Sequence, residues 1–88
     1  MEAYIAQKAD QALEALVSDK PLLERLAAAH SHFQLVTNDE FFLDSAPENV
    51  RDAIRSFVLL DVAKHTAEAA RACKDAIAVV LEERGRTS

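Results

Sequence analysis

The sequence has little of what disulfide frameworks, phosphate loops or membrane spans require. Its 88 residues contain one cysteine, one glycine, two prolines and no tryptophan. A disulfide within the chain needs two cysteines, so it is excluded, and a backbone phosphate cradle, which needs several glycines, is not expected. No run approaches the roughly 18 apolar residues of a transmembrane helix. With a lone thiol, which is compatible with a reducing compartment, we expect a cytoplasmic protein without a membrane partner.

Positive charge is scarce in the first half of the chain. Residues 1–46 contain eight acidic and three basic residues, whereas residues 47–88 contain seven of each, which gives a net charge of -5. A protein that binds the phosphates of nucleic acid presents a clustered basic face. The sequence shows no such cluster, so we expect no nucleic-acid partner.

Large core side chains are also few. Hydrophobic residues make up 50% of the chain and charged residues 28%, which is the balance of a globular protein, and the length fits a single domain over residues 1–88. Seventeen of the hydrophobic residues are alanine, however. Self-association is one way to compensate for such a small core, so the composition favours a homodimer.

Helical spacing dominates what is present, and no alternating segment predicts a strand. The sequence predicts an all-α fold, a small bundle of three to four helices with a long C-terminal helix. The helices are expected at about residues 2–17, 20–36, 38–44 and 46–84. The third and fourth starts rest on capping-box spacings at residues 37–40 and 45–48, and Gly85 stands where a terminating glycine would.

The predicted helix over residues 46–84 carries two apolar stripes on nearly opposite faces. Either it kinks near residue 57 and both stripes face one core, or it stays straight and its halves face different partners. We favour the straight helix, because the second stripe has small residues at the spacing of a close helix pair. That stripe predicts a dimer interface of Leu59, Val62, Thr66, Ala69, Ala70, Cys73, Ile77 and Val80. Packing of residues 2–17 on the same stripe is the alternative.

Metal-ligating residues are sparse, with one candidate group. Asp61, His65 and Glu68 are spaced so that one helical face would hold two carboxylates and an imidazole. Lys64 and Arg71 lie in ion-pair register on that face, so a solvated surface with weak salt bridges is the simpler interpretation. We therefore predict no metal and no cofactor, and keep these three residues as the one candidate.

The sequence also lacks the motifs of known catalytic sites, such as a nucleophile elbow or a zinc-binding HExxH helix. Cys73 lies within the small-residue stripe, where burial makes a thiol inert. His30 and His32 point in different directions on a helix, so we expect a partly buried His30 and a solvated His32. An enzyme is not expected.

Residues 38–48 carry the strongest local signal, because acidic residues surround two phenylalanines without a basic residue. Aromatic anchors inside an acidic rim are typical of protein interfaces. The predicted partner-binding residues are Asp39, Glu40, Phe41, Phe42, Asp44 and Glu48. We expect Phe41 and Phe42 to face different ways, with at least one of them filling the end of the bundle.

These features predict a non-enzymatic, acidic interaction module that binds a protein target with a basic or grooved surface. An inhibitor or adaptor suits it best, a class that includes phage- or plasmid-type inhibitors of host systems, immunity proteins and chaperones. Two alternatives stay open. One is a metal- or small-ligand-binding bundle, and the other is a structural oligomerisation element of a larger assembly.

Overall fold

The computed structural model of the chain describes residues 3–39 and 41–87, without the side chains of residues 43, 44 and 87. Its elements in chain order are α1 (Ala3–Leu16), α2 (Leu22–Thr37), the single turn α3 (Phe42–Ser45), α4 (Glu48–Val58) and α5 (Thr66–Thr87). The described residues contain no strand, which confirms the predicted all-α class. None of the described helices offers an apolar stretch of the length that crossing a bilayer requires.

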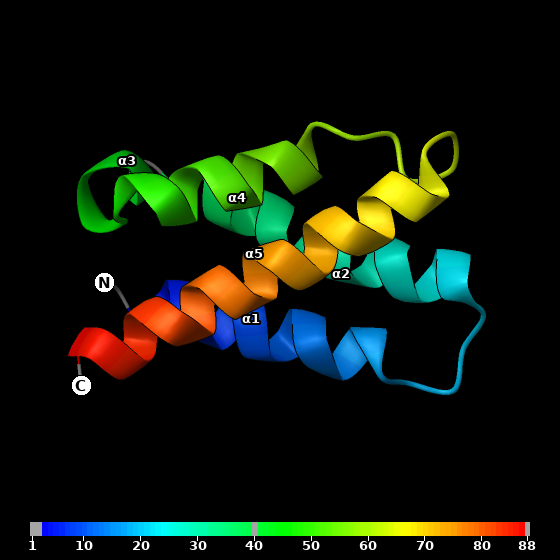
Figure 1. Ribbon diagram of the computed structural model, residues 1–88, viewed down its shortest axis with the longest axis horizontal. Helices are drawn as coiled ribbons and strands as arrows, with labels where there is room; N and C mark the ends of the chain where they lie inside the picture. The colour runs from blue at the N-terminus through cyan, green and yellow to red at the C-terminus, as the bar shows by residue number, and fades with distance from the viewer. Residues whose placement is uncertain (1–2, 40, 88) are drawn as a thin grey trace.

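The helices pack into a bundle of 33 × 22 × 18 Å (Figure 1). α1 and α2 form an antiparallel hairpin, α4 lies beside α2, and α5 lies against α1, α2 and α4. The start of α1, the end of α5 and α3 lie at one end of the bundle, on the left in Figure 1. The α1–α2 loop and the turn between α4 and α5 lie at the opposite end.

One hydrophobic core holds the helices together, and large and very small side chains share it. Phe33 of α2 and Phe57 of α4 are fully buried and meet edge to face, with ring centres 5.9 Å apart. Burying a side chain of this size contributes about 2–3 kcal/mol. Alanines fill much of the remaining core, namely Ala9, Ala12, Ala29, Ala69 and Ala76. Because alanine lets helix axes approach closely, the alanine-rich composition serves packing within one chain.

The prediction of one helix over residues 46–84 is wrong, because the chain turns at residues 59–65. The carboxylate of Asp61 accepts hydrogen bonds from the backbone N–H groups of Ala63 (3.1 Å) and Lys64 (3.2 Å). Such side-chain acceptors compete with helix formation. The turn lets α4 and α5 bury their opposite stripes in the same core, so neither a straight helix nor a kinked continuous one forms.

Two other boundaries also differ from the prediction. The helix expected over residues 38–44 is only the single turn α3, and neither Phe41 before α3 nor Pro47 before α4 makes a side-chain cap hydrogen bond. The box at residues 45–48 therefore does not cap α4, and Glu40 of the box at residues 37–40 lies outside the described residues. The hydroxyl of Thr37 donates instead to a carbonyl of the last turn of α2. Pro47 favours an extended residue before it, and Ala46 has a ψ of 137°, which ends α3.

Gly85 does not terminate the last helix, contrary to the prediction. α5 continues through it to Thr87, and the glycine has no positive φ. The preceding residue, Arg84, bonds to Asp10 of α1 at 2.8 Å. This exposed pair joins the final turns of α5 to α1.

Candidate functional site

The predicted partner-binding segment, residues 38–48, forms the corner between α2 and α4, which we call the α3 corner (Figure 1). Local hydrogen bonds fix it. The carboxylate of Asp39 accepts the N–H of Phe41 at 2.8 Å, and its carbonyl accepts the N–H of Phe42 at 3.1 Å. The Phe41 carbonyl accepts the N–H of Ser45 at 2.9 Å. The backbone that carries the two phenylalanines is therefore held by its own chain.

The two phenylalanines face different ways, as predicted. Phe42 is 3% exposed and belongs to the core, where the guanidinium of Arg55 lies 5.9 Å from its ring centre. Phe42 thus fills the end of the bundle. Phe41 is 61% exposed. A phenyl ring left in water retains apolar area that a partner protein can cover, so Phe41 is available as an anchor.

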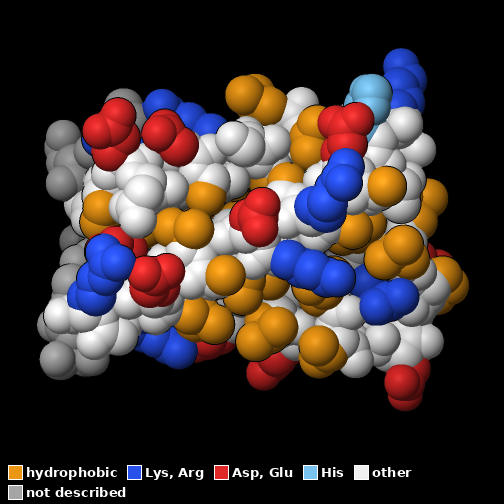
Figure 2. Space-filling view, in the orientation of Figure 1, with side chains coloured by type: hydrophobic (Ala, Val, Ile, Leu, Met, Phe, Trp, Pro, Cys, Tyr) orange, Lys and Arg blue, Asp and Glu red, His pale blue; other side chains and the backbone are white. Residues whose placement is uncertain are grey.

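The charges around Phe41 are more mixed than predicted. Glu48 is exposed in the first turn of α4 and Asp39 is half-buried, whereas Glu40 and the side chain of Asp44 lie outside the described residues. Spacings of three and seven put Arg51 and Arg55 on the same face of α4 as Glu48. Figure 2 shows acidic and basic side chains together over this end of the bundle. The prediction was limited to residues 38–48. The helical spacing of Arg51 and Arg55 from Glu48 would have shown that basic residues lie on the same face.

The predicted dimer stripe lies largely inside one chain. Ala69, Cys73, Ile77 and Val80 are buried in its own core, and α5 lies against α1. The prediction that these four residues form a dimer interface is therefore wrong, and the alternative of packing by residues 2–17 holds. Small side chains suit both arrangements equally, which is why the sequence did not separate them. The other four predicted residues, Leu59, Val62, Thr66 and Ala70, keep part of their surface exposed.

Cys73 is enclosed within this core. Burial raises the pKa of its thiol from 9.0 to about 11, against the smaller opposing influence of Lys74. A neutral, buried thiol is a poor nucleophile. The sequence-based expectation of an inert Cys73 is consistent with this environment.

The metal candidate does not assemble. Asp61 and His65 lie in the turn before α5, so they do not share a helical face with Glu68. One carboxylate oxygen of Asp61 already accepts two backbone N–H groups. Within residues 3–39 and 41–87, no group of three histidine, cysteine or acidic side chains is placed to hold a metal ion.

The two histidines of α2 differ in their contacts. His30 is half-buried, as predicted, and its Nε2 lies 2.8 Å from the carbonyl oxygen of Val58. Its ring also meets Phe57 edge to face at 5.4 Å. His32 was predicted to be solvated, but it is half-buried and its buried Nδ1 bonds to none of the described residues. Packing of α2 against its neighbours covers both rings.

An open groove of about 450 Å³ lies between the outer face of α2 and the turn at residues 59–65. Most of its lining is apolar. The lining residues are Leu23, Ala27, His30, Ser31, Leu60, Asp61, Val62 and Ala63. Leu59, which directly precedes the lining residues of the turn, is 85% exposed. The sequence did not predict this groove, because the prediction placed residues 59–63 inside a continuous helix.

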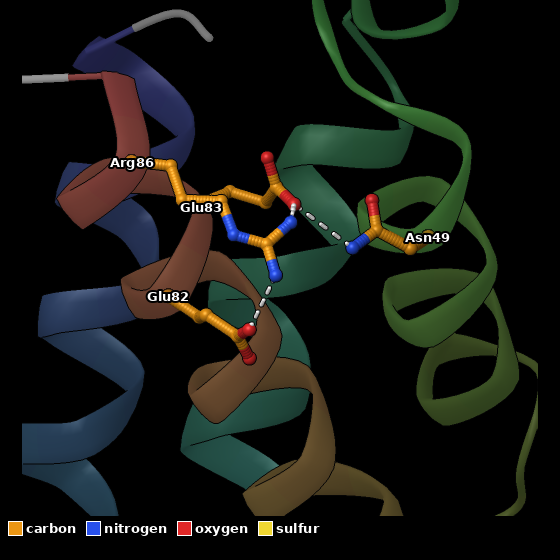
Figure 3. A network of polar contacts seen from close by, with 4 residues as sticks. All are labelled: Asn49, Glu82, Glu83 and Arg86. Atoms are coloured by element: carbon orange, nitrogen blue, oxygen red, sulfur yellow. Dashed lines mark hydrogen bonds and ion pairs between the residues drawn. The ribbon is translucent and has the colours of Figure 1, made fainter.

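A polar network joins the start of α4 to the end of α5 (Figure 3). The buried carboxylate of Glu83 accepts hydrogen bonds from Asn49 of α4 and from Arg86, both at 3.1 Å. Arg86 also pairs with Glu82 at 2.7 Å. A buried carboxylate needs such partners, because an unpaired one would be costly. These residues contact one another within the bundle, so the network is structural.

Two surfaces therefore stand out at opposite ends of the bundle. One is the α3 corner with exposed Phe41, and the other is the groove with exposed Leu59 beside it. Comparison of the chain with protein families, with curated proteins and with solved structures gave no match.

Proposed function

We propose that this chain is a non-enzymatic interaction module that binds a target protein through the α3 corner and acts as an inhibitor or adaptor. One observation carries the proposal. Phe41 is 61% exposed, whereas its neighbour Phe42 is 3% exposed. A folded chain that is short of large core residues leaves a phenyl ring outside its core, and a partner protein is the surface that would cover it.

The backbone of the α3 corner supports this role. The carboxylate of Asp39 accepts a hydrogen bond from the backbone N–H of Phe41 at 2.8 Å, and α3 begins at the next residue. An anchor on a preorganised backbone loses little conformational entropy on binding, so more of its burial energy contributes to affinity. Phe41 therefore suits a pocket in a partner that need not reshape the corner.

Charge supports a basic partner surface. The chain has a net charge of -5, and Glu48 is exposed near Phe41 along the chain. Acidic groups around an apolar anchor steer encounter with a basic surface and lower the affinity for acidic ones. Arg51 and Arg55 of α4 partly offset the negative charge of this surface. We therefore expect the association rate to depend moderately on salt concentration.

Affinity purification with matched variants tests the proposal. Wild type and the variants Phe41→Ala and Leu35→Ala are tagged and used to capture partners from the native cells. Leu35 is the control because it is 49% exposed on α2, outside residues 38–48. We expect one stoichiometric partner with wild type and Leu35→Ala, and loss of that partner with Phe41→Ala.

Titration of the purified partner then gives the size of the effect. An anchor residue contributes roughly 2–4 kcal/mol, so Phe41→Ala should weaken binding by roughly 30- to 1,000-fold. Equal affinities of wild type and Phe41→Ala would show that the α3 corner is not the binding surface.

A further inference from the structure

The turn at residues 59–65 contains nothing that a helix excludes. Residues 48–84 have neither proline nor glycine, and no residue of the turn has a positive φ. Leu59 keeps a right-handed helical φ of -75° and ψ of -13°, and its N–H bonds to the carbonyl of Arg55, four residues earlier. At the other end, the N–H of His65 bonds to the carbonyl of Asp61 at the same spacing. Rotation of the residues between these two bonds would join α4 and α5 into one helix.

One side chain favours the turn over that helix. The carboxylate of Asp61 accepts hydrogen bonds from the N–H groups of Ala63 and Lys64. In a continuous helix, the carbonyls of Leu59 and Leu60, four residues earlier, would accept from the same two groups. The turn and the helix therefore satisfy the same donors, and the acceptor supplied by Asp61 stabilises the turn.

A continuous helix cannot bury the apolar faces of both α4 and α5 in its own bundle. The buried hydrophobic residues are Val50, Ile54 and Phe57 in α4, and Ala69, Cys73, Ala76, Ile77 and Val80 in α5. At about 100° per residue, the two sets lie on different faces of a straight helix. The face of α5 then needs a surface made of α1, α2 and α4, because these are the helices that it contacts in the monomer. A second copy of the chain offers that surface.

We propose that the chain has a second state, a domain-swapped dimer, in which residues 59–65 are helical and the two copies exchange α5. In the monomer, α4 and α5 lie in contact and run in opposite directions (Figure 1). Two straight helices that run antiparallel to each other restore this contact twice, once in each bundle. The interface of the dimer is therefore the hydrophobic core itself, with α5 supplied by the other copy.

Protein concentration during folding selects between the two states. The short turn holds α5 beside its own core at an effective concentration of about 1 mM or more, so dilute chains fold as monomers. At higher concentration, α5 of another copy competes for the same site. Because α5 must leave a packed core before the copies separate, the dimer exchanges slowly once it has formed.

The exchange changes the number of binding surfaces on one particle. Residues 38–48 lie outside the exchanged helix, so the dimer carries two α3 corners, each with an exposed Phe41. Two linked anchors raise the avidity for a target with two sites by roughly 100- to 10,000-fold. This consequence rests on the proposed function, whereas the exchange of α5 does not.

Refolding of the full chain at two concentrations tests the exchange. Chains unfolded in guanidinium are diluted to about 5 µM or about 1 mM, and light scattering after size exclusion gives the masses. We expect 9.7 kDa at the lower concentration and an additional species of twice that mass at the higher one. The isolated dimer should persist for hours after dilution and return to monomer only after unfolding. Return within seconds would indicate a surface contact and overturn the proposal.

Variants of the turn should shift the dimer fraction in opposite directions. Asp61→Ala removes the acceptor that stabilises the turn and favours the helix, so the fraction should rise at least about threefold. Asp75→Ala, which removes an exposed aspartate within α5, is the matched control and should behave like wild type. Insertion of two glycines between Leu60 and Asp61 breaks the helix and lengthens the turn, so it should abolish the dimer but not folding.

Two results with these chains would contradict the exchange. One is the absence of a dimer from both wild type and Asp61→Ala after refolding at about 1 mM. The other is a dimer that survives the glycine insertion. Circular dichroism and thermal unfolding verify that each variant is folded.

Crosslinking identifies the exchanged helix. Asp10 of α1 and Arg84 of α5 form an exposed pair, so cysteines at these positions lie within reach of a short bis-maleimide. One chain carries Asp10→Cys and a second, tagged chain carries Arg84→Cys, both with Cys73→Ala. Chains refolded together at high concentration should crosslink to each other, and chains refolded separately and then mixed should not. A dimer fraction without this crosslink would exclude the exchange of α5.

Discussion

His30 of α2 and Val58, the last residue of α4, are joined by a hydrogen bond of 2.8 Å. A carbonyl oxygen only accepts, so Nε2 of the imidazole carries the proton of this bond. The bond satisfies one of the carbonyls that every helix leaves free at its end. It therefore fixes the point at which α4 stops and the turn towards α5 begins.

Replacing His30 by alanine should lower the free energy of unfolding by about 1–2 kcal/mol. The change removes the bond to Val58 and the edge-to-face contact with Phe57. Urea unfolding followed by circular dichroism measures it. His65→Ala is the matched control, since His65 is exposed in the same turn, and should change stability by less than about 0.5 kcal/mol. Equal losses in the two variants would contradict a special role for His30.

Two adjacent glutamates of α5 should differ sharply in their contribution to stability. Glu83→Ala removes the buried acceptor of Asn49 and Arg86, and is expected to destabilise the fold by about 1–3 kcal/mol. Glu82→Ala removes only an exposed pair with Arg86 and should cost less than about 0.5 kcal/mol. Thermal and urea unfolding of both variants give the comparison. A loss in Glu82→Ala as large as that in Glu83→Ala would refute the structural role of the network.

Gly85→Ala should stabilise the protein by about 0.5–1 kcal/mol. Gly85 lies within α5 without a positive φ, and an added Cβ would meet nothing within 4 Å. Alanine restricts the unfolded chain more than glycine does and favours the helix. An increase in the midpoint of thermal unfolding checks this expectation. If α5 ended at Gly85 in solution, the substitution would have no stabilising effect.

The buried thiol of Cys73 should make stability fall in alkaline solution. The pKa rises from 9.0 to about 11 on folding, so below pH 9 both states hold the proton. Between pH 9 and 11 the unfolded chain loses the proton more readily than the folded one, which favours unfolding by about 1 kcal/mol at pH 10. Cys73→Ala should lack this part of the pH dependence. Urea unfolding of wild type and Cys73→Ala, measured from about pH 8 to about pH 10.5, isolates it. Parallel curves would contradict burial of the thiol.

The sequence predicted the helices over residues 2–17 and 20–36 well, because each has one apolar stripe with polar residues opposite. It also predicted the different orientations of Phe41 and Phe42. The turn at residues 59–65 was missed, since neither proline nor glycine occurs there. The reversal of the apolar stripe after Phe57 was in fact the sign of a break, and Asp61 supplies the local acceptor that makes the break possible.

The two candidate surfaces were predictable to different degrees. The α3 corner depends on neighbours along the chain, so residues 38–48 identified it, apart from the arginines that α4 adds. The groove depends on α2 meeting a turn that is distant in sequence, and such contacts follow from packing alone. The network of Glu83 with Asn49 is of the same kind, because it joins two helices.

The position of α5 against α1, α2 and α4 has a consequence for synthesis. Helices form in the order in which they leave the ribosome, and α5 is the last of the five along the chain. Until it emerges, the apolar side chains of α1, α2 and α4 that pack against α5 stay exposed to solvent. Nascent chains that stop before α5 should therefore be substrates for chaperones and proteases, whereas chains that include α5 escape them.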